Sequence, residues 1–217
     1  YGGINMALSK VDYNSLNVTP AASKALKWNS NANGFETGDV AGAMVLLETQ
    51  TASSDSTIDF TSGIDSTYKE YLFRFYDIHP SNDGVNFQFN GRDGSSAFDA
   101  TKTSTHFRFY HDEADTATAL AYWTGGDVAQ GTGVHKLSAG LGNDNDASLA
   151  GYLHLYNPSN TTFVKHFKGA VNYEADAYTA TSFSAGYFNV TDAIDGIQFS
   201  YSAGDIDAGT FKLYGVA

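Results

Sequence analysis

The sequence predicts an all-β protein, an antiparallel β-sandwich with an extended N-terminal arm. Three observations carry this prediction. Phe and Tyr contribute 15 and 14 of the 217 residues, with 22 Gly and only 3 Pro, a bias that suits half-buried pleated strands. Apolar and polar residues alternate in short segments that are separated by Asp, Asn, Ser and Gly. No helical apolar period intervenes between these segments, which favours a sandwich over βαβ units.

Residues 1–42 form the arm, because small and polar residues dominate them and their apolar residues are too sparse for a core of their own. Two local structures compete within the arm. Thr19 and Pro20 could cap and begin a short helix. The alternative is a hairpin in which residues 25–29 pair with residues 35–37 across a turn that ends in Asn33-Gly34. Asn-Gly is the stronger local signal, so the hairpin is preferred.

Residues 43–217 form the body. Strands of period two are expected at 68–76, 85–89, 106–110, 151–156, 197–201 and 211–214, and less regular strands at 44–49, 57–60, 119–124, 163–171 and 183–188. The apolar members expected to point inward are Phe73, Phe87, Phe107, Leu153, Phe199 and Phe211. A jelly roll is the expected topology, because double-sheet sandwiches with this number of strands commonly adopt it.

Composition excludes several classes of function. The chain holds 12 Lys and Arg against 24 Asp and Glu, a net charge of -12, so nucleic acid is not an expected partner. The first 42 residues are neutral overall, so the excess negative charge lies on the body. Cysteine is absent, which excludes disulfides, thiolate zinc sites and a cysteine nucleophile. No apolar run approaches the roughly 20 residues that span a bilayer, so membrane insertion is not expected.

Two acidic segments are candidate Ca²⁺ sites. Asp112, Glu113 and Asp115 follow a strand and offer hard oxygen ligands. The preferred alternative is a solvated turn whose Asp side chains cap their own backbone. Residues 142–147 (GNDNDA) resemble a calcium loop less well, because the Gly and Glu positions of an EF-hand are missing. The expectation is therefore no cofactor, with Asp112, Glu113 and Asp115 as the best metal candidates.

Aromatic residues supply the candidate contact surfaces. Tyr152, His154 and Tyr156 share one strand face, which could stack sugar rings or, as the preferred interpretation, contact another subunit. Trp123 precedes a Gly-rich segment and is either an exposed ring for a glycan or a core residue; the sequence does not separate these. No nucleophile elbow or phosphate-binding glycine loop occurs.

Three segments also resemble a known family: residues 58–65 (IDFTSGID), 107–115 (FRFYHDEAD) and 205–216 (DIDAGTFKLYGV). Together they resemble structural proteins of tailed bacteriophages, mostly marine phages, whose members are β-rich domains displayed as capsid decorations, fibres or tail appendages. The resemblance covers most of residues 50–217 and brings no catalytic motif. It implies a non-enzymatic protein of the virion surface, a homotrimer that contacts capsid or tail proteins of the particle.

The arm is the expected anchor to the particle. Its neutral charge avoids repulsion from an acidic neighbour, and its isolated apolar side chains can fill grooves on a partner. These anchoring residues are Val11, Tyr13, Leu16, Leu26 and Trp28. The function expected from the sequence is thus that of an exposed capsid decoration, cement or tail-appendage protein acting through protein interfaces. The competing function is a carbohydrate-binding fibre tip or receptor-recognition module that contacts a host surface glycan.

Overall fold

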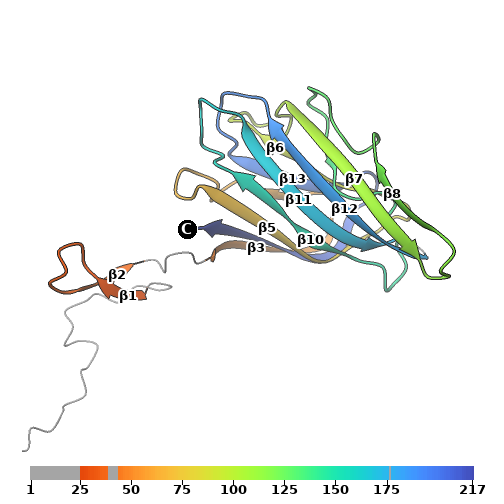
Figure 1. The fold of residues 1–217 in the computed structure, drawn as a ribbon, viewed down its shortest axis with the longest axis horizontal. Coiled ribbons are helices and arrows are strands. Elements are labelled where there is room, and N and C mark those ends of the chain that lie inside the picture. Colours follow the sequence, from red (N-terminus) through yellow and green to blue (C-terminus); the bar gives the residue numbers. More distant parts are fainter. Residues whose placement is uncertain (1–24, 39–43, 176) are drawn as a thin grey trace, which may run out of the picture. The chain divides into compact units, whose positions relative to one another are not determined.

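The structure is a computed structural model that describes residues 25–38, 44–175 and 177–217 (Figure 1). Contacts divide the chain into two units, with the boundary between Ala43 and Met44. The described residues form strands and connecting turns without any α-helix, which confirms the all-β prediction. Among these residues, accordingly, no helix is long and apolar enough to cross a membrane.

The described part of the first unit is a β-hairpin. β1 (Ala25–Trp28) pairs antiparallel with β2 (Phe35–Gly38), and Trp28 lies opposite Phe35. The turn is closed by backbone hydrogen bonds from Asn29 N to Gly34 O and from Ala32 N to Asn29 O. The hairpin expected around Asn33-Gly34 is therefore confirmed. The remainder of the arm, including the alternative helix start at Thr19 and Pro20, lies outside the described residues.

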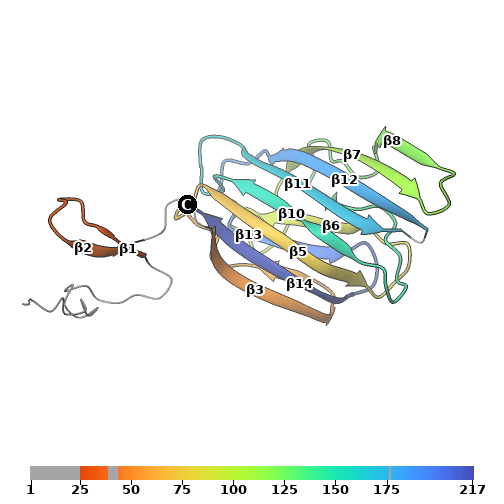
Figure 2. The same ribbon diagram turned by 60° about the horizontal axis from the view of Figure 1, so that its bottom comes forward.

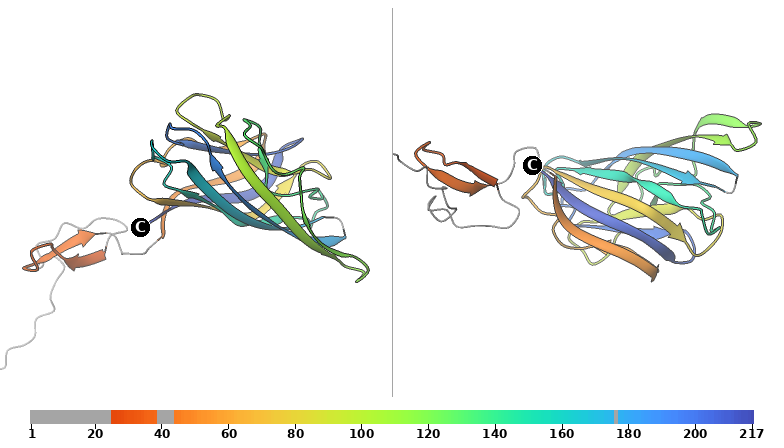
Figure 3. Two further views of the ribbon diagram at one scale, coloured as in Figure 1. Left: turned by 45° about the horizontal axis from the view of Figure 1, so that its top comes forward. Right: turned by 90° about the horizontal axis from the view of Figure 1, so that it is seen from below.

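The body is a sandwich of two antiparallel sheets. The larger sheet has eight strands, which follow one another across Figure 2 in the order β3 (Met44–Asp55), β14 (Ile206–Val216), β5 (Glu70–Pro80), β10 (Leu149–Tyr156), β11 (Lys165–Glu174), β12 (Tyr178–Phe188), β7 (Lys102–Asp112) and β8 (Thr118–Tyr122). The smaller sheet has four strands, in the order β4 (Ile58–Phe60), β13 (Gly196–Tyr201), β6 (Phe87–Arg92) and β9 (His135–Lys136). Figure 3 shows the two layers from further angles.

The strand order contains that of a jelly roll. If β7, β8, β11 and β12 are set aside, the remaining strands lie in the orders β3-β14-β5-β10 and β4-β13-β6-β9. When these eight strands are numbered in chain order, one sheet consists of strands 1, 8, 3 and 6 and the other of strands 2, 7, 4 and 5. This is the strand order of a jelly roll, which is built from two Greek keys. β7–β8 and β11–β12 are hairpins inserted into this scheme. Both extend the first sheet, which doubles its width and gives it a broad outer face.

Phenylalanine side chains fill the space between the sheets. Phe199 of β13 is fully buried, and its ring centroid lies 5.1 Å from that of Phe75 and 5.4 Å from that of Phe73. Edge-to-face geometry prevails in these contacts, as aromatic quadrupoles favour. Five of the six side chains predicted to point inward are buried: Phe73, Phe87, Leu153, Phe199 and Phe211.

The prediction for Phe107 was wrong. Its side chain is 42% exposed and stacks on Phe183 of the neighbouring strand, on the outer face of the larger sheet. The inward positions of β7 are instead polar, with Ser104 and His106 buried. These polar side chains find hydrogen-bond partners inside the sandwich. Polar residues of this strand can therefore point into the core while its Phe side chains point outward.

Candidate functional site

The outer face of the eight-stranded sheet gathers most of the candidate residues. Tyr152, His154 and Tyr156 of β10 all lie on it, as the period of the strand predicts. The His154 ring lies edge-to-face with Tyr152, at a centroid distance of 5.1 Å, and stacks on Tyr156 at 5.9 Å. His154 Nδ1 also hydrogen-bonds with the Glu70 carboxylate. The three rings are partly exposed and form a fixed row along the strand.

Basic side chains accompany this row. Arg74 of β5 lies directly between Tyr152 of β10 and Lys212 of β14 in the register of the sheet. Lys168 of β11 lies opposite His154. Lys212 Nζ is 5.6 Å from the centre of the Tyr76 ring, within cation–π distance. Arg74, Lys168 and Lys212 make no ion pair with any carboxylate among the described residues.

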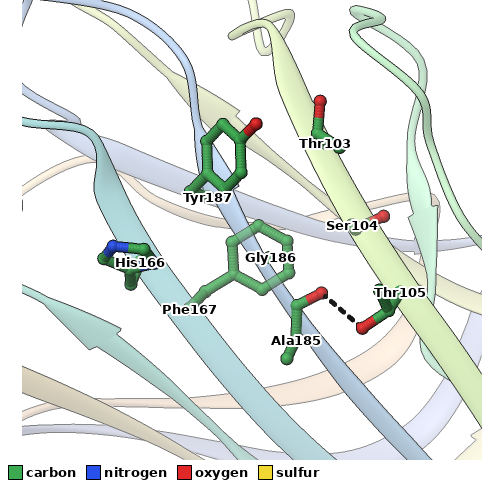
Figure 4. A pocket seen from close by; sticks show the side chains of 8 residues that line it. All are labelled: Thr103, Ser104, Thr105, His166, Phe167, Ala185, Gly186 and Tyr187. Atoms are coloured by element: carbon green, nitrogen blue, oxygen red, sulfur yellow. Dashed lines mark hydrogen bonds between the residues drawn. The ribbon is translucent and has the colours of Figure 1, made fainter.

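Two adjoining hollows lie on the same face, over β11, β12 and β7. One has a volume of about 270 Å³ and is drawn in Figure 4, where His166 and Tyr187 lie on one side and Thr103 and Thr105 on the other. Its centre is formed by Gly186 and the Phe167 ring beneath it; a Cβ on Gly186 would lie 2.6 Å from Phe167 Cζ. Thr105 Oγ1 donates a hydrogen bond to Ala185 O at 3.3 Å (Figure 4).

The second hollow, of about 260 Å³, shares Thr105 and Ala185 with the first and is bordered by Phe107, Phe183 and Lys168. The Phe107 and Phe183 rings are nearly parallel, with their centroids 5.3 Å apart. The Phe109 ring also stacks on Phe183, with their centroids 6.1 Å apart. Leu120 and Tyr122 of the edge strand β8 extend the exposed apolar surface and are 72% and 52% exposed.

Trp123 is neither a free platform nor a core residue. It is partly buried, and its ring lies edge-to-face with His106 at 4.9 Å. The Arg108 guanidinium and the Lys136 ammonium both lie within cation–π distance, at 5.7 and 5.5 Å from the ring centre. Gly125 and Gly126 fold closely against the indole. Trp123 therefore holds the loop after β8 against the sandwich.

The Asp112 carboxylate caps a turn. It accepts hydrogen bonds from the backbone N–H of Thr116 at 2.8 Å and of Ala117 at 2.9 Å, and from the Thr116 hydroxyl. The hydroxyl bond, followed by the two amide bonds, lowers the pKa of Asp112. Asp115 pairs with His111, and no group of three or more His, Asp or Glu side chains within the described ranges is placed to hold a metal ion. Asp112 therefore caps the turn with its side chain, as the alternative interpretation describes for an Asp of this segment.

A polar cluster is buried between the sheets beneath these surfaces. His106 Nδ1–H donates a hydrogen bond to Lys136 O at 2.9 Å, and Nε2 of the neutral ring accepts one from the Ser182 hydroxyl at 3.1 Å. His135 Nδ1 contacts Ser104 Oγ at 2.9 Å, whereas its Nε2 has no hydrogen-bond partner among the described residues. Burial lowers the pKa of His106 to about 4 and that of His135 to about 3. Both rings are therefore neutral near pH 7, which lets them pack as core residues.

The hairpin carries its own apolar face. Leu26, Trp28 and Phe35 lie on one side, with 42%, 61% and 38% of their surfaces exposed. Trp28 and Phe35 stack with ring centroids 4.5 Å apart. Lys27 and Glu36 form an ion pair on the opposite side. The structure thus places two of the five proposed anchoring residues together; Val11, Tyr13 and Leu16 lie outside the described residues.

Comparison with known proteins adds no identification: no protein-family model and no curated protein matches this chain. Sequence reasoning had not found the outward stack of Phe107 and Phe183 or the juxtaposition of Arg74 and Lys212. Alternation places Arg74 and Lys212 on outward positions of their own strands. The pairing of β5 with β14, which brings the two residues together, depends on the strand order of the whole sheet.

Proposed function

We propose that this protein is an exposed structural component of a phage virion, a jelly-roll capsid decoration, cement or tail-appendage protein that acts through protein interfaces. The observation that carries the proposal is the hairpin, whose apolar face of Leu26, Trp28 and Phe35 is exposed. The body is a sandwich with a closed aromatic core. The resemblance of residues 58–65, 107–115 and 205–216 to phage structural proteins supports the same role.

A single two-stranded hairpin is marginally stable in water, and this one presents a stacked Trp–Phe pair to solvent. Burial of such a pair in a groove of a partner would stabilise both the hairpin and the contact, and aromatic residues frequently dominate binding energy in this way. A capsid or tail protein is the partner we propose. The hairpin unit is thus an attachment device and the acidic body is the displayed domain.

Self-association is part of the proposal. β3 and β8 are the edge strands of the larger sheet, and natural proteins cover or blunt such edges. Closed symmetric assembly is the common way to achieve this, and a homotrimer is the form we propose. Its site of action is the virion surface, and its role is structural rather than enzymatic.

Deletion of residues 6–42 tests the attachment role. The truncated body should remain folded and soluble but fail to enter virions, measured as copies per particle in purified phage. A finer test replaces Leu26 and Trp28 by Ala, with Lys27→Ala on the opposite face of the hairpin as the matched control. The double variant should be lost from particles while the control is retained. Normal incorporation of the truncated body would place the anchor on the sandwich instead.

A second candidate function is recognition of a surface glycan by the body. The specific observation in its favour is the partly exposed row of Tyr152, His154 and Tyr156 on the outer sheet face. Aromatic rings fixed in this manner can stack on sugar rings. Binding of the isolated chain to glycans on an array would support recognition, whereas binding to assembled capsids alone would support decoration.

A further inference from the structure

One transverse row of side chains crosses the outer face of the eight-stranded sheet. Paired positions on neighbouring strands place its members side by side from β14 to β7, in the order Lys212, Arg74, Tyr152, Ala170, Phe183 and Phe107. We call this set the transverse row. Cations occupy one end and stacked aromatic rings the other. Lys168 flanks the row and lines the hollow beside Phe107 and Phe183.

The cationic end lacks a counter-charge. Lys212 and Arg74 lie directly opposite each other, and like charges in that relation destabilise a sheet. No carboxylate of the described residues pairs with either one. Arg74 Nε is buried and has no hydrogen-bond partner among those residues. Two adjacent cations without a counter-ion repel each other less when an anion binds between them, so the arrangement fits an anion bound beside Arg74 and Lys212.

The cations of this face contrast with the charge of the whole chain. The protein has a net charge of -12. Yet Arg74, Lys168 and Lys212 share this face, and the acidic side chain beside them, Glu70, is hydrogen-bonded to His154. Exposed charges are screened beyond about 8 Å at physiological ionic strength, so a ligand lying on the row interacts mainly with these cations. The local charge therefore complements an anion despite the overall acidity.

The aromatic end suits sugar rings. Tyr152, Phe183 and Phe107 lie along the same line, with the Phe107 ring stacked on Phe183, and Thr105 and Lys168 border the adjoining hollow. Neighbouring strands are about 4.8 Å apart, so the row spans about 24 Å from β14 to β7. That length accommodates a chain of several sugar rings. The surface is shallow and open, as an extended polymer requires, rather than enclosed around a small molecule.

We propose that the outer face of the eight-stranded sheet binds an acidic polysaccharide along the transverse row, with Arg74, Lys212 and Lys168 contacting its carboxylates and Tyr152, Phe183 and Phe107 stacking on its rings. This inference rests on the recognition function proposed above and names its ligand class. A nucleic acid is a poorer fit, because binding to its closely spaced phosphates relies on many Lys and Arg contacts, whereas this face offers three cations. A second copy of this chain would bring the same cations rather than the missing anions.

The test measures binding of the full chain to polygalacturonate, dextran sulfate, neutral dextran and a single-stranded oligonucleotide at low salt. Polygalacturonate should bind, more weakly as sodium chloride is added, and neutral dextran should not. Lys168→Ala and Lys212→Ala should each weaken binding about tenfold, as loss of one charged hydrogen bond predicts. Lys69→Ala removes an exposed lysine that hydrogen-bonds Asn157 and serves as the matched control. Melting temperatures of all variants establish that they remain folded.

Each outcome separates the alternatives. If dextran sulfate binds as tightly as polygalacturonate and Lys168→Ala weakens both to the same extent, the transverse row is supported as the binding site, with sulfate able to serve as the anion. Neutral dextran binding that is lost in Tyr152→Ala but retained in Lys212→Ala would preserve glycan recognition and overturn the acidic ligand. Tighter binding of the oligonucleotide, self-association abolished by Lys212→Ala, or the absence of binding to either acidic polymer would each overturn the proposal.

Discussion

Replacement of Phe199 by Ala should destabilise the body more than any comparable change on its surface. The side chain is fully buried. Its ring centroid lies between 5.1 and 6.4 Å from those of Phe60, Phe73, Phe75, Phe87, Phe89 and Phe211. Truncation of a buried Phe costs about 3 to 5 kcal/mol, because the surrounding side chains only partly collapse into the cavity. For a domain of this size, the melting temperature should fall by about 10 °C.

Phe107→Ala is the matched comparison, since the same atoms are removed from a ring that is 42% exposed and contacts Phe183 along one side. Its expected cost is about 1 kcal/mol, the value of an aromatic pair on a surface. Urea-induced unfolding of the full chain, followed by circular dichroism, measures both free energies. Equal losses for the two variants would refute the register assigned to β7 and restore Phe107 to the core.

Three further predictions concern the buried histidines, the domain boundary and the acidic turn. Between pH 7 and pH 5 the unfolded chain protonates its histidines, whereas burial keeps the pKa of His106 at about 4 and that of His135 at about 3. The free energy of unfolding should therefore decrease by about 2 kcal/mol for each of the two histidines as the pH falls from 7 to 5. His135→Asn should remove about half of the combined decrease, and an unchanged pH dependence in this variant would contradict the low pKa of His135. A fragment of residues 44–217 should melt as cooperatively as the full chain, because the hairpin unit shares none of the core; a disordered spectrum would show that the arm completes the fold. Millimolar calcium should leave the melting temperature unchanged, since turn amides and Thr116 already occupy the Asp112 carboxylate; a rise that disappears in Asp112→Asn would establish a calcium site.

Local signals in the sequence were enough to predict the strands and most of the core. Alternation along 68–76 placed Phe73 inward correctly, because one strand face must be apolar wherever a sheet covers a core. Asn33-Gly34 marked the first hairpin, although the left-handed residue of its turn is Ala32, with a φ of 52°, rather than Asn33 or Gly34. Alternation also placed Tyr152, His154 and Tyr156 on one face, although it could not tell which residues of other strands would lie beside them.

The sequence by itself determined the class of fold, the hairpin and the common face of the β10 rings, because each depends on residues that are neighbours along the chain. Only the tertiary structure decided which side chains of β7 point into the core and which side chains lie beside Arg74. Phe107 points outward because Ser104 and His106 find hydrogen-bond partners inside the sandwich, and those partners come from strands far away in the sequence. Lys212 and Arg74 meet because the jelly-roll order makes the last strand of the chain a neighbour of β5. Contacts of this kind are set by strand pairing over the whole domain, which no local pattern of residues encodes.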